Sequence, residues 1–139
     1  MAIFVLKDAV VTVDAVNLSD HVSEVSIETE RDEVDVTAMG AVNKVQVAGL
    51  GDATITCTMF QDFAATKVDA TLWPLSSTNT PFVVTVKAFS TATAVTNPLY
   101  SMTCLMYGYS PLSGGIGDAS STEVVFRNAA QAGLTRATA

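Results

Sequence analysis

The chain has little of the chemistry that enzymes and metal sites commonly use. Histidine occurs once, at His21, and the 2 cysteines, Cys57 and Cys104, do not form a C-x-x-C pair. Zinc-ligand spacings are therefore missing, and we expect His21 to be a turn or surface histidine rather than a ligand or general base. No phosphate loop and no nucleophile with a recognisable base occurs, so no catalytic, cofactor or metal site is expected. Pairs of Asp and Glu keep an enzyme as a distant alternative.

Long apolar runs are also absent. Residues 1–6 are apolar, but Lys7 and Asp8 follow at once, so the run is too short for a secretory signal. No segment approaches the ~18 apolar residues of a transmembrane helix. We therefore expect a chain that is made and folded in a cytoplasm, has no membrane partner, and keeps both cysteines as buried free thiols.

Basic residues are scarce. The chain has 7 Lys and Arg and 14 Asp and Glu, and its net charge is −7. Residues 1–70 carry −8 of this charge and residues 71–139 carry +1. Because phosphate affinity comes from Lys and Arg that release counterions, sequence-specific DNA binding is not expected. A surface past which DNA slides without sticking remains compatible with this charge. The low charged fraction, 15%, also indicates that self-assembly covers part of the surface.

The chain is rich in the residues that favour strands. Hydrophobic residues make up 49% of it, and Val and Thr are abundant, which predicts one strand-dominated domain over residues 1–139. The shorter predicted strands are Ala2–Leu6, Val10–Val13, Pro81–Phe89, Leu99–Tyr109 and Thr122–Phe126. Residues 127–139 form a small-residue tail with weak structure of its own, which either frays or docks on a neighbour.

Two long strands dominate the pattern. In the first, Val25 and Ile27 alternate with serine and glutamate, which predicts one buried face and one acidic, solvated face. In the second, threonines alternate with apolar residues from Ala53 to Met59, so one face is buried and the other presents hydroxyls.

The segment between these strands breaks their alternation. The apolar residues of the first strand are odd-numbered up to Thr29, whereas Val34 and Val36 are even-numbered, so we expect a bulge or kink near residues 31–33. The acidic cluster at residues 30–33 is expected to be a solvated strand face rather than a calcium site. Residues 37–51 are predicted to be a long loop whose apolar side chains bury against another copy of the chain.

Helical spacing replaces the strand pattern at about residues 62–76. Val68 and Leu72 define an apolar stripe that should pack on the sheet, Asp62 or Asp69 is available as a cap, and Trp73 is predicted to be a core anchor. Residues 110–118 are the most glycine-rich segment. They are predicted to be a turn between strands, because the GK[ST] ending of a phosphate loop is missing.

Several segments, in order along most of the chain, resemble a known family. They are NLSDHV (17–22), DEVDVTAMG (32–40), FQDFAA (60–65) with VDATLWPL (68–75), TNPLY (96–100) and YSPLSGGIGD (109–118). Together they resemble the tail tube (major tail) proteins of long-tailed, siphovirus-like phages, especially the actinobacterial-phage type.

This resemblance implies a mainly β fold, a β-sandwich or barrel with one flanking α-helix at about 62–76 and a long loop at about 37–51. It also implies that six copies form a ring and that rings stack into a hollow tube, which conducts DNA and surrounds a tape-measure protein. In such rings each subunit contributes four strands to an inner barrel. With ~4.8 Å between strands and a tilt of about 45°, twenty-four strands close at a backbone diameter of roughly 50 Å, which admits duplex DNA.

The resemblance further implies partners and locations. The partners are other copies of the chain, the tape-measure protein, and the tail terminator and distal tail proteins, while DNA passes without specific binding. The chain would be part of the virion tail after assembly in the host cytoplasm. Residues 1–8 and 128–139 are candidate assembly arms that would make secondary contacts with other copies of the chain.

Two sets of surface residues follow from this comparison. The residues expected to face the lumen are Ser26, Glu28, Glu30, Thr54, Thr56 and Thr58. The residues expected at the contact between rings are Met39, Gly40, Val42, Asn43, Lys44 and Val45. A capsid decoration protein, or another phage structural β-domain, is the nearest alternative function.

Overall fold

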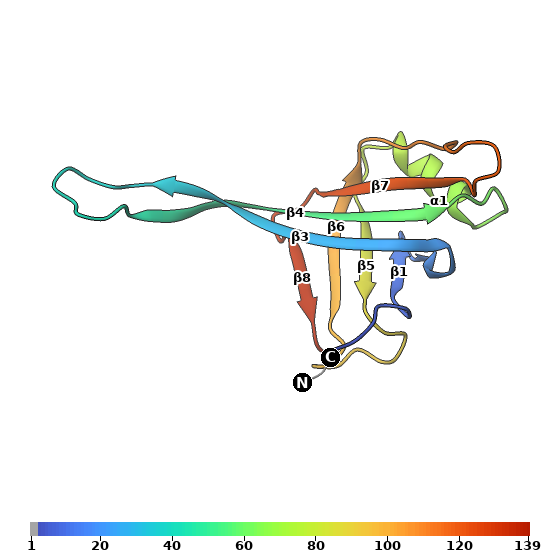
Figure 1. Cartoon of the computed structure of the whole chain (residues 1–139), viewed down its shortest axis with the longest axis horizontal. Helices are drawn as coiled ribbons and strands as arrows, with labels where there is room; N and C mark the ends of the chain where they lie inside the picture. The colour runs from blue at the N-terminus through green and yellow to red at the C-terminus, as the bar shows by residue number, and fades with distance from the viewer. Residues whose placement is uncertain (1–2) are drawn as a thin grey trace.

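The computed structural model describes residues 3–139 as a mainly β chain in which a long hairpin projects from a packed body (Figure 1). The elements in chain order are β1 (Val10–Val13), β2 (Val16–Asn17), the 3-10 turn η1 (Ser19–His21), β3 (Val22–Asp35), β4 (Gln46–Phe60), α1 (Val68–Ser76), β5 (Phe82–Lys87), β6 (Leu99–Met106), β7 (Ser121–Asn128) and β8 (Leu134–Ala137). The predicted mainly β architecture with one helix is confirmed.

Every strand pairing within residues 3–139 is antiparallel, and the strands form one sheet that folds over on itself. The order is β2-β1-β5-β6-β7-β4-β3, and β8 also pairs with β6. In Figure 1, β3, β4 and β7 run across the direction of β1, β5, β6 and β8. Strand β7 joins the two layers, because it pairs with β4 along its length and with the end of β6.

The hydrophobic core lies between these layers. Alternate residues of β4, β5, β6 and β7 point into it, as expected for strands with one buried face. Phe82 of β5 and Phe126 of β7 meet edge to face, with ring centroids 5.9 Å apart. Val68 and Leu72 of α1 join the same buried cluster as Ile55, so the helix covers the core as predicted.

The helix is shorter than the predicted 62–76. Its first residue is Val68, since the carboxylate of Asp62 accepts a bond from the backbone N–H of Ala64, and Thr66 adopts a left-handed φ of 63°. These local features favour a turn over a helix. No side chain caps α1, although the backbone carbonyl of Asp62 accepts the N–H of Asp69 in its first turn at 3.1 Å. Trp73 is 59% exposed, so its prediction as a core anchor is wrong.

Several predicted strand limits also differ. Ala2 lies outside the described residues, and residues 3–6 form no strand, although Phe4 packs against Phe89 with ring centroids 5.1 Å apart. The strand predicted to reach Tyr109 ends at Met106. The tail is more ordered than expected, because β8 pairs with β6 of its own chain through Leu134–Ala137.

The loop is shorter than the predicted 37–51, because β4 begins at Gln46. A register shift between Arg31 and Glu33 confirms the predicted bulge, and the extra residue is on β4, where Arg31 pairs with Gly51 and Glu33 pairs with Ala48. The inserted residue turns the side chains of β4 to opposite faces on its two sides. The alternation of apolar and polar residues that indicates a strand is therefore interrupted there. A Cβ on Gly49 would lie 3.1 Å from the Asp32 Cβ, so a side chain there would require its neighbours in the bulge to shift.

Candidate functional site

The six residues predicted to line a lumen share one face of the β3–β4 hairpin. Ser26 pairs with Thr56 and Glu28 with Thr54, while the intervening pair, Ile27 and Ile55, points to the core side. Glu30 continues the same face opposite Asp52, and Thr58 lies opposite Glu24. The polar face is therefore a continuous surface of hydroxyl and carboxylate groups on the outside of the body.

Strand β7 extends this polar face by one more strand. Glu123 pairs with Thr58, Val125 with Thr56 and Arg127 with Thr54. The face then carries the carboxylates of Glu24, Glu28, Glu30, Asp52 and Glu123 and the single guanidinium of Arg127. Such a surface is predominantly negative, with one basic group at its β7 edge.

The outer half of the β3–β4 hairpin, residues 32–50, forms an arm that extends beyond the body (Figure 1). Val34 pairs with Val47, and the backbone N–H of Val36 donates to the Val45 carbonyl at 2.9 Å, so these four valines share one face of the arm. We call this set the valine face. Each of the four is between 43% and 52% exposed. The opposite face carries Glu33, Asp35, Gln46 and Ala48, so the arm is amphipathic without a core beneath it.

The valine face turns away from the chain's own core. Because β3 contains no inserted residue at the bulge, its even-numbered residues keep the same phase from Glu28 to Val34. The side chain of Val34 in β3 therefore lies on the same side of the hairpin as the polar face, whereas Val25 and Ile27 lie on the core side. A two-stranded ribbon with no layer against its apolar side is at best marginally stable in water, so a surface that covered the valine face would stabilise the arm.

The residues predicted to contact a neighbouring ring all lie at or near the tip of this arm. Met39 is 105% exposed and Val42 is 96% exposed. Gly40 has a φ of +86°, which forms the turn. The tip is held by Thr37, whose hydroxyl accepts a bond from the backbone N–H of Val45 at 2.8 Å. Hydrogen bonding by the Thr37 side chain, and then by the Thr37 backbone N–H, holds the pKa of the Asp35 carboxylate below its ordinary value.

His21 forms an unexpected clamp between two connections. Its Nδ1 lies 2.8 Å from the Asp20 carboxylate, and its Nε2 lies 2.7 Å from the carboxylate of Asp62, which follows β4. The hydrogen bond and charge of Asp20, with those of Asp62, raise the pKa of His21. Lys67 lies 3.6 Å from the other oxygen of Asp20. Sequence spacing gave no sign of this clamp, because Asp62 is 41 residues away.

A second network holds the end of the body that carries α1. The Tyr109 hydroxyl donates to the Asp69 carboxylate of α1 at 2.8 Å and accepts a bond from the Gln61 side chain at 2.9 Å. Gln61 also donates to the carbonyl of Pro111 at 2.6 Å. Burial raises the pKa of Tyr109 to about 12. These bonds tie the end of β4, the helix and the 107–120 connection into one surface.

Residues 3–139 contain no group of three or more His, Cys, Asp or Glu side chains arranged to hold a metal ion. Cys57 and Cys104 are buried and free, as predicted, and burial raises the pKa of each thiol to about 12. No helix in this part has the length and hydrophobicity of a membrane span.

The sequence matches no protein-family model and no curated protein. Solved structures do share its fold. A chain in the virion of a native gene transfer agent (GTA) particle aligns at a TM-score of 0.72 and 14% identity, covering 94% of this chain and 95% of that one. A chain in the sheath/tube terminator of the PVC extracellular contractile injection system aligns at 0.74 and 11%, covering 99% and 98%.

A third similar chain comes from the tail of an empty GTA particle, an assembly of C6 symmetry. It aligns at a TM-score of 0.66 and 14% identity, covering 84% of this chain and 82% of that one. At such identities the likeness establishes the fold. The tail-tube type of fold expected from the sequence is therefore confirmed, since chains of the same fold occur in tail, tube and terminator assemblies.

Proposed function

We propose that this chain is a structural subunit of a tail tube of the siphovirus-like phage type. Six copies form a ring, and rings stack into a hollow tube that surrounds a tape-measure protein during assembly and later conducts DNA. The tube ends against a tail terminator and distal tail proteins, after assembly in the host cytoplasm. This role needs no catalysis.

The observation that carries the proposal is the whole-chain fold likeness. Tail and injection-system chains align over nearly the full length of both partners. The C6 symmetry of the empty GTA tail is a property of that assembly, and it supports six copies per ring here by analogy.

The polar face supports the lumen assignment. DNA in the tube would meet threonine hydroxyls and the carboxylates of Glu28 and Glu30. Repulsion between carboxylates and phosphates, screened over about 10 Å at 0.1 M salt, keeps the duplex from adhering to the wall. Arg127 is the one basic group on this face, too few to retain DNA by counterion release.

The arm supports the stacking assignment. A tube needs a contact that leaves the ring, and the arm is the part of the described chain that projects farthest from the body (Figure 1). Its tip carries the predicted inter-ring residues, the valine face adjoins that tip, and residues 1–8 and 128–139 would add secondary contacts. Met1 and Ala2 of the first segment lie outside the described residues.

Negative-stain electron microscopy of concentrated protein, with sedimentation velocity on the same sample, tests the proposal. Six-fold rings or hollow tubes are the expected result. If the protein stays monomeric even when a tape-measure protein and an initiating tail complex are supplied, the tube assignment fails. Binding to capsids would then favour the decoration-protein alternative.

A further inference from the structure

Among the exposed apolar surfaces of the described chain, two lie at opposite ends of the molecule. One is the valine face with the tip of the arm. The other, which we call the end surface, surrounds α1 and the 107–120 connection. Its large apolar side chains are exposed by 46% to 108%: Phe60, Phe63, Trp73, Leu112 and Ile116.

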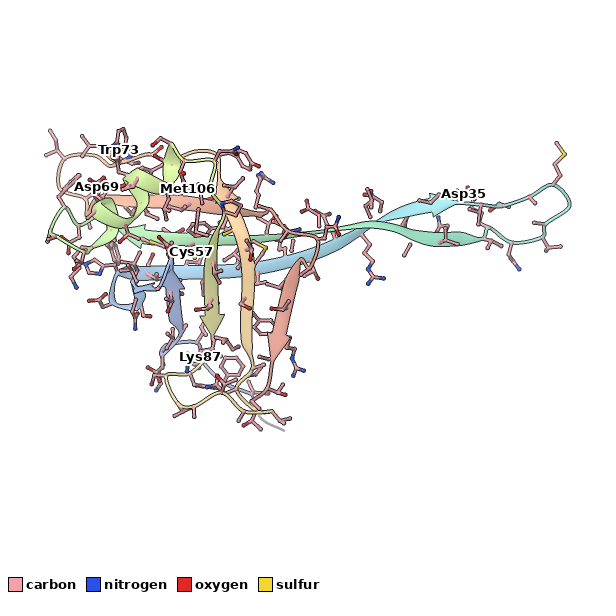
Figure 2. All side chains as sticks on the ribbon, turned by 180° about the vertical axis from the view of Figure 1, so that it is seen from behind. Asp35, Cys57, Asp69, Trp73, Lys87 and Met106 are labelled. Atoms are coloured by element: carbon pink, nitrogen blue, oxygen red, sulfur yellow. The ribbon has the colours of Figure 1, made fainter. Side chains whose placement is uncertain are left out.

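The separation of these surfaces prevents one from covering the other within a chain. Figure 2 places Trp73 and Asp69 at one end of the molecule and Asp35, on the arm, at the other. Apolar surfaces of this kind mark interaction sites when several large side chains gather. Two complementary surfaces at opposite ends generate a head-to-tail contact, which propagates instead of closing.

We propose that the arm of one copy docks on the end surface of the next copy, with the valine face and tip against the aromatic side chains around α1. This inference rests on the proposed function, in which the arm is the contact between rings. It adds the identity of the surface that receives the arm.

The charges favour this pairing. Lys44 is the single charged residue between Val36 and Val45. The end surface is bordered by Asp69 and by the exposed Asp118, while the nearby cation, Lys67, lies 3.6 Å from Asp20. The arm tip is therefore positive and its receiving surface negative, which steers the two together.

The same charges disfavour contact between two arms. A two-fold contact pairs a surface with itself, so a contact between two arm tips would bring Lys44 close to Lys44 of the other copy, with no carboxylate in residues 37–44 to pair with it. Such a contact would also close after two copies. A tube requires a contact that repeats.

Disulfide trapping in assembled tubes tests the inference. A mass-tagged Val42→Cys chain is mixed with an untagged Leu112→Cys chain, assembled, oxidised and run on a non-reducing gel. The native thiols are buried, so the engineered ones are the reactive pair. The matched control replaces the second chain by Ala92→Cys, whose exposed position lies in the β5–β6 connection at the side of the body.

The expected result is a band with the mass of one tagged and one untagged chain, present with Leu112→Cys and absent with Ala92→Cys. Circular dichroism of each variant checks that the fold is intact. Tubes in which Val42→Cys links to itself, links equally to Ala92→Cys, or links to nothing overturn the inference while leaving the proposed function in place. If wild-type protein forms no tube with its initiating components, the proposed function fails and this inference fails with it.

Discussion

At the scale of single residues, His21 illustrates how a side chain acquires a role from distant neighbours. Its ring lies between the carboxylates of Asp20 and Asp62, so it joins the connection before β3 to the connection after β4. The protonated ring donates to both carboxylates, which raises the pKa of His21 and lowers that of Asp20, while the backbone N–H of Ala64 and then the His21 ring lower the pKa of Asp62. The clamp therefore stabilises the fold while the ring is charged.

The clamp predicts a stability that depends on pH. The contribution of His21 is fully present below its unfolded pKa of about 6.5 and is lost as pH rises through the higher folded pKa. The carboxylates contribute above their unfolded pKa of about 3.9 and lose that contribution as pH falls. Replacing His21→Gln should lower Tm by about 2–5 °C at pH 6, with a smaller difference at pH 9.

Thermal unfolding followed by circular dichroism, at a concentration where the protein is unassembled, measures this difference. Ser19→Ala is not a suitable control, because the Ser19 hydroxyl accepts the backbone N–H of Val11. The exposed Thr80→Ala is a better one and should leave Tm constant relative to wild type at both pH values. An equal loss for His21→Gln at pH 6 and pH 9 would contradict a charged clamp.

At the scale of elements, the arm is the part of the chain whose apolar side chains lack a covering layer. It has one valine face and one acidic face, yet no layer of its own chain lies against the valines. Because the bulge keeps these valines in phase with the polar face, the arm cannot fold back to share the core.

The arm predicts a separation between folding and assembly. Replacing Met39 and Val42 by Asp should leave Tm of the unassembled chain within about 2 °C, because both side chains are fully exposed, but should abolish stacking by burying unpaired charges. Sedimentation and electron microscopy measure the assembly. The control, Gln46→Lys with Ala48→Lys, places new charges opposite Asp35 and Glu33 and should impair assembly less. Tubes of normal length from the Asp variant would remove the tip from the contact.

At the scale of the whole molecule, the folded-over sheet separates a polar face from a projecting arm. One layer buries its inner side against the core and keeps a polar outer face, while its β3–β4 hairpin continues past the body as the arm (Figure 1). In the proposed tube, the wall of the lumen and the contact between rings would be built from this same pair of strands. A shift in one strand register would alter both.

The polar face predicts how a charge reversal would act. Glu28→Lys with Glu30→Lys should leave tube assembly largely intact, because both side chains are exposed, and should make the tube bind duplex DNA at low salt. Co-sedimentation of tubes with DNA over a salt series measures this binding, which should weaken steeply as salt rises. The control Ser77→Lys with Thr80→Lys adds positive charge in an exposed loop. Equal DNA binding by this control would argue against a lumen position for Glu28 and Glu30.

The sequence by itself determined the strand-rich fold, the alternation of β3 and β4, the place of the bulge and the free cysteines, because these depend on local spacing and composition. The tertiary structure decided the rest. The turn at Asp62 sets where the helix begins, and the His21 clamp depends on a contact between residues 41 positions apart. Residues 134–137 form a strand because they pair with β6. Only the pairing of β7 with β4 brought Arg127 and Glu123 to the polar face, since strand pairing depends on contacts that no local pattern encodes.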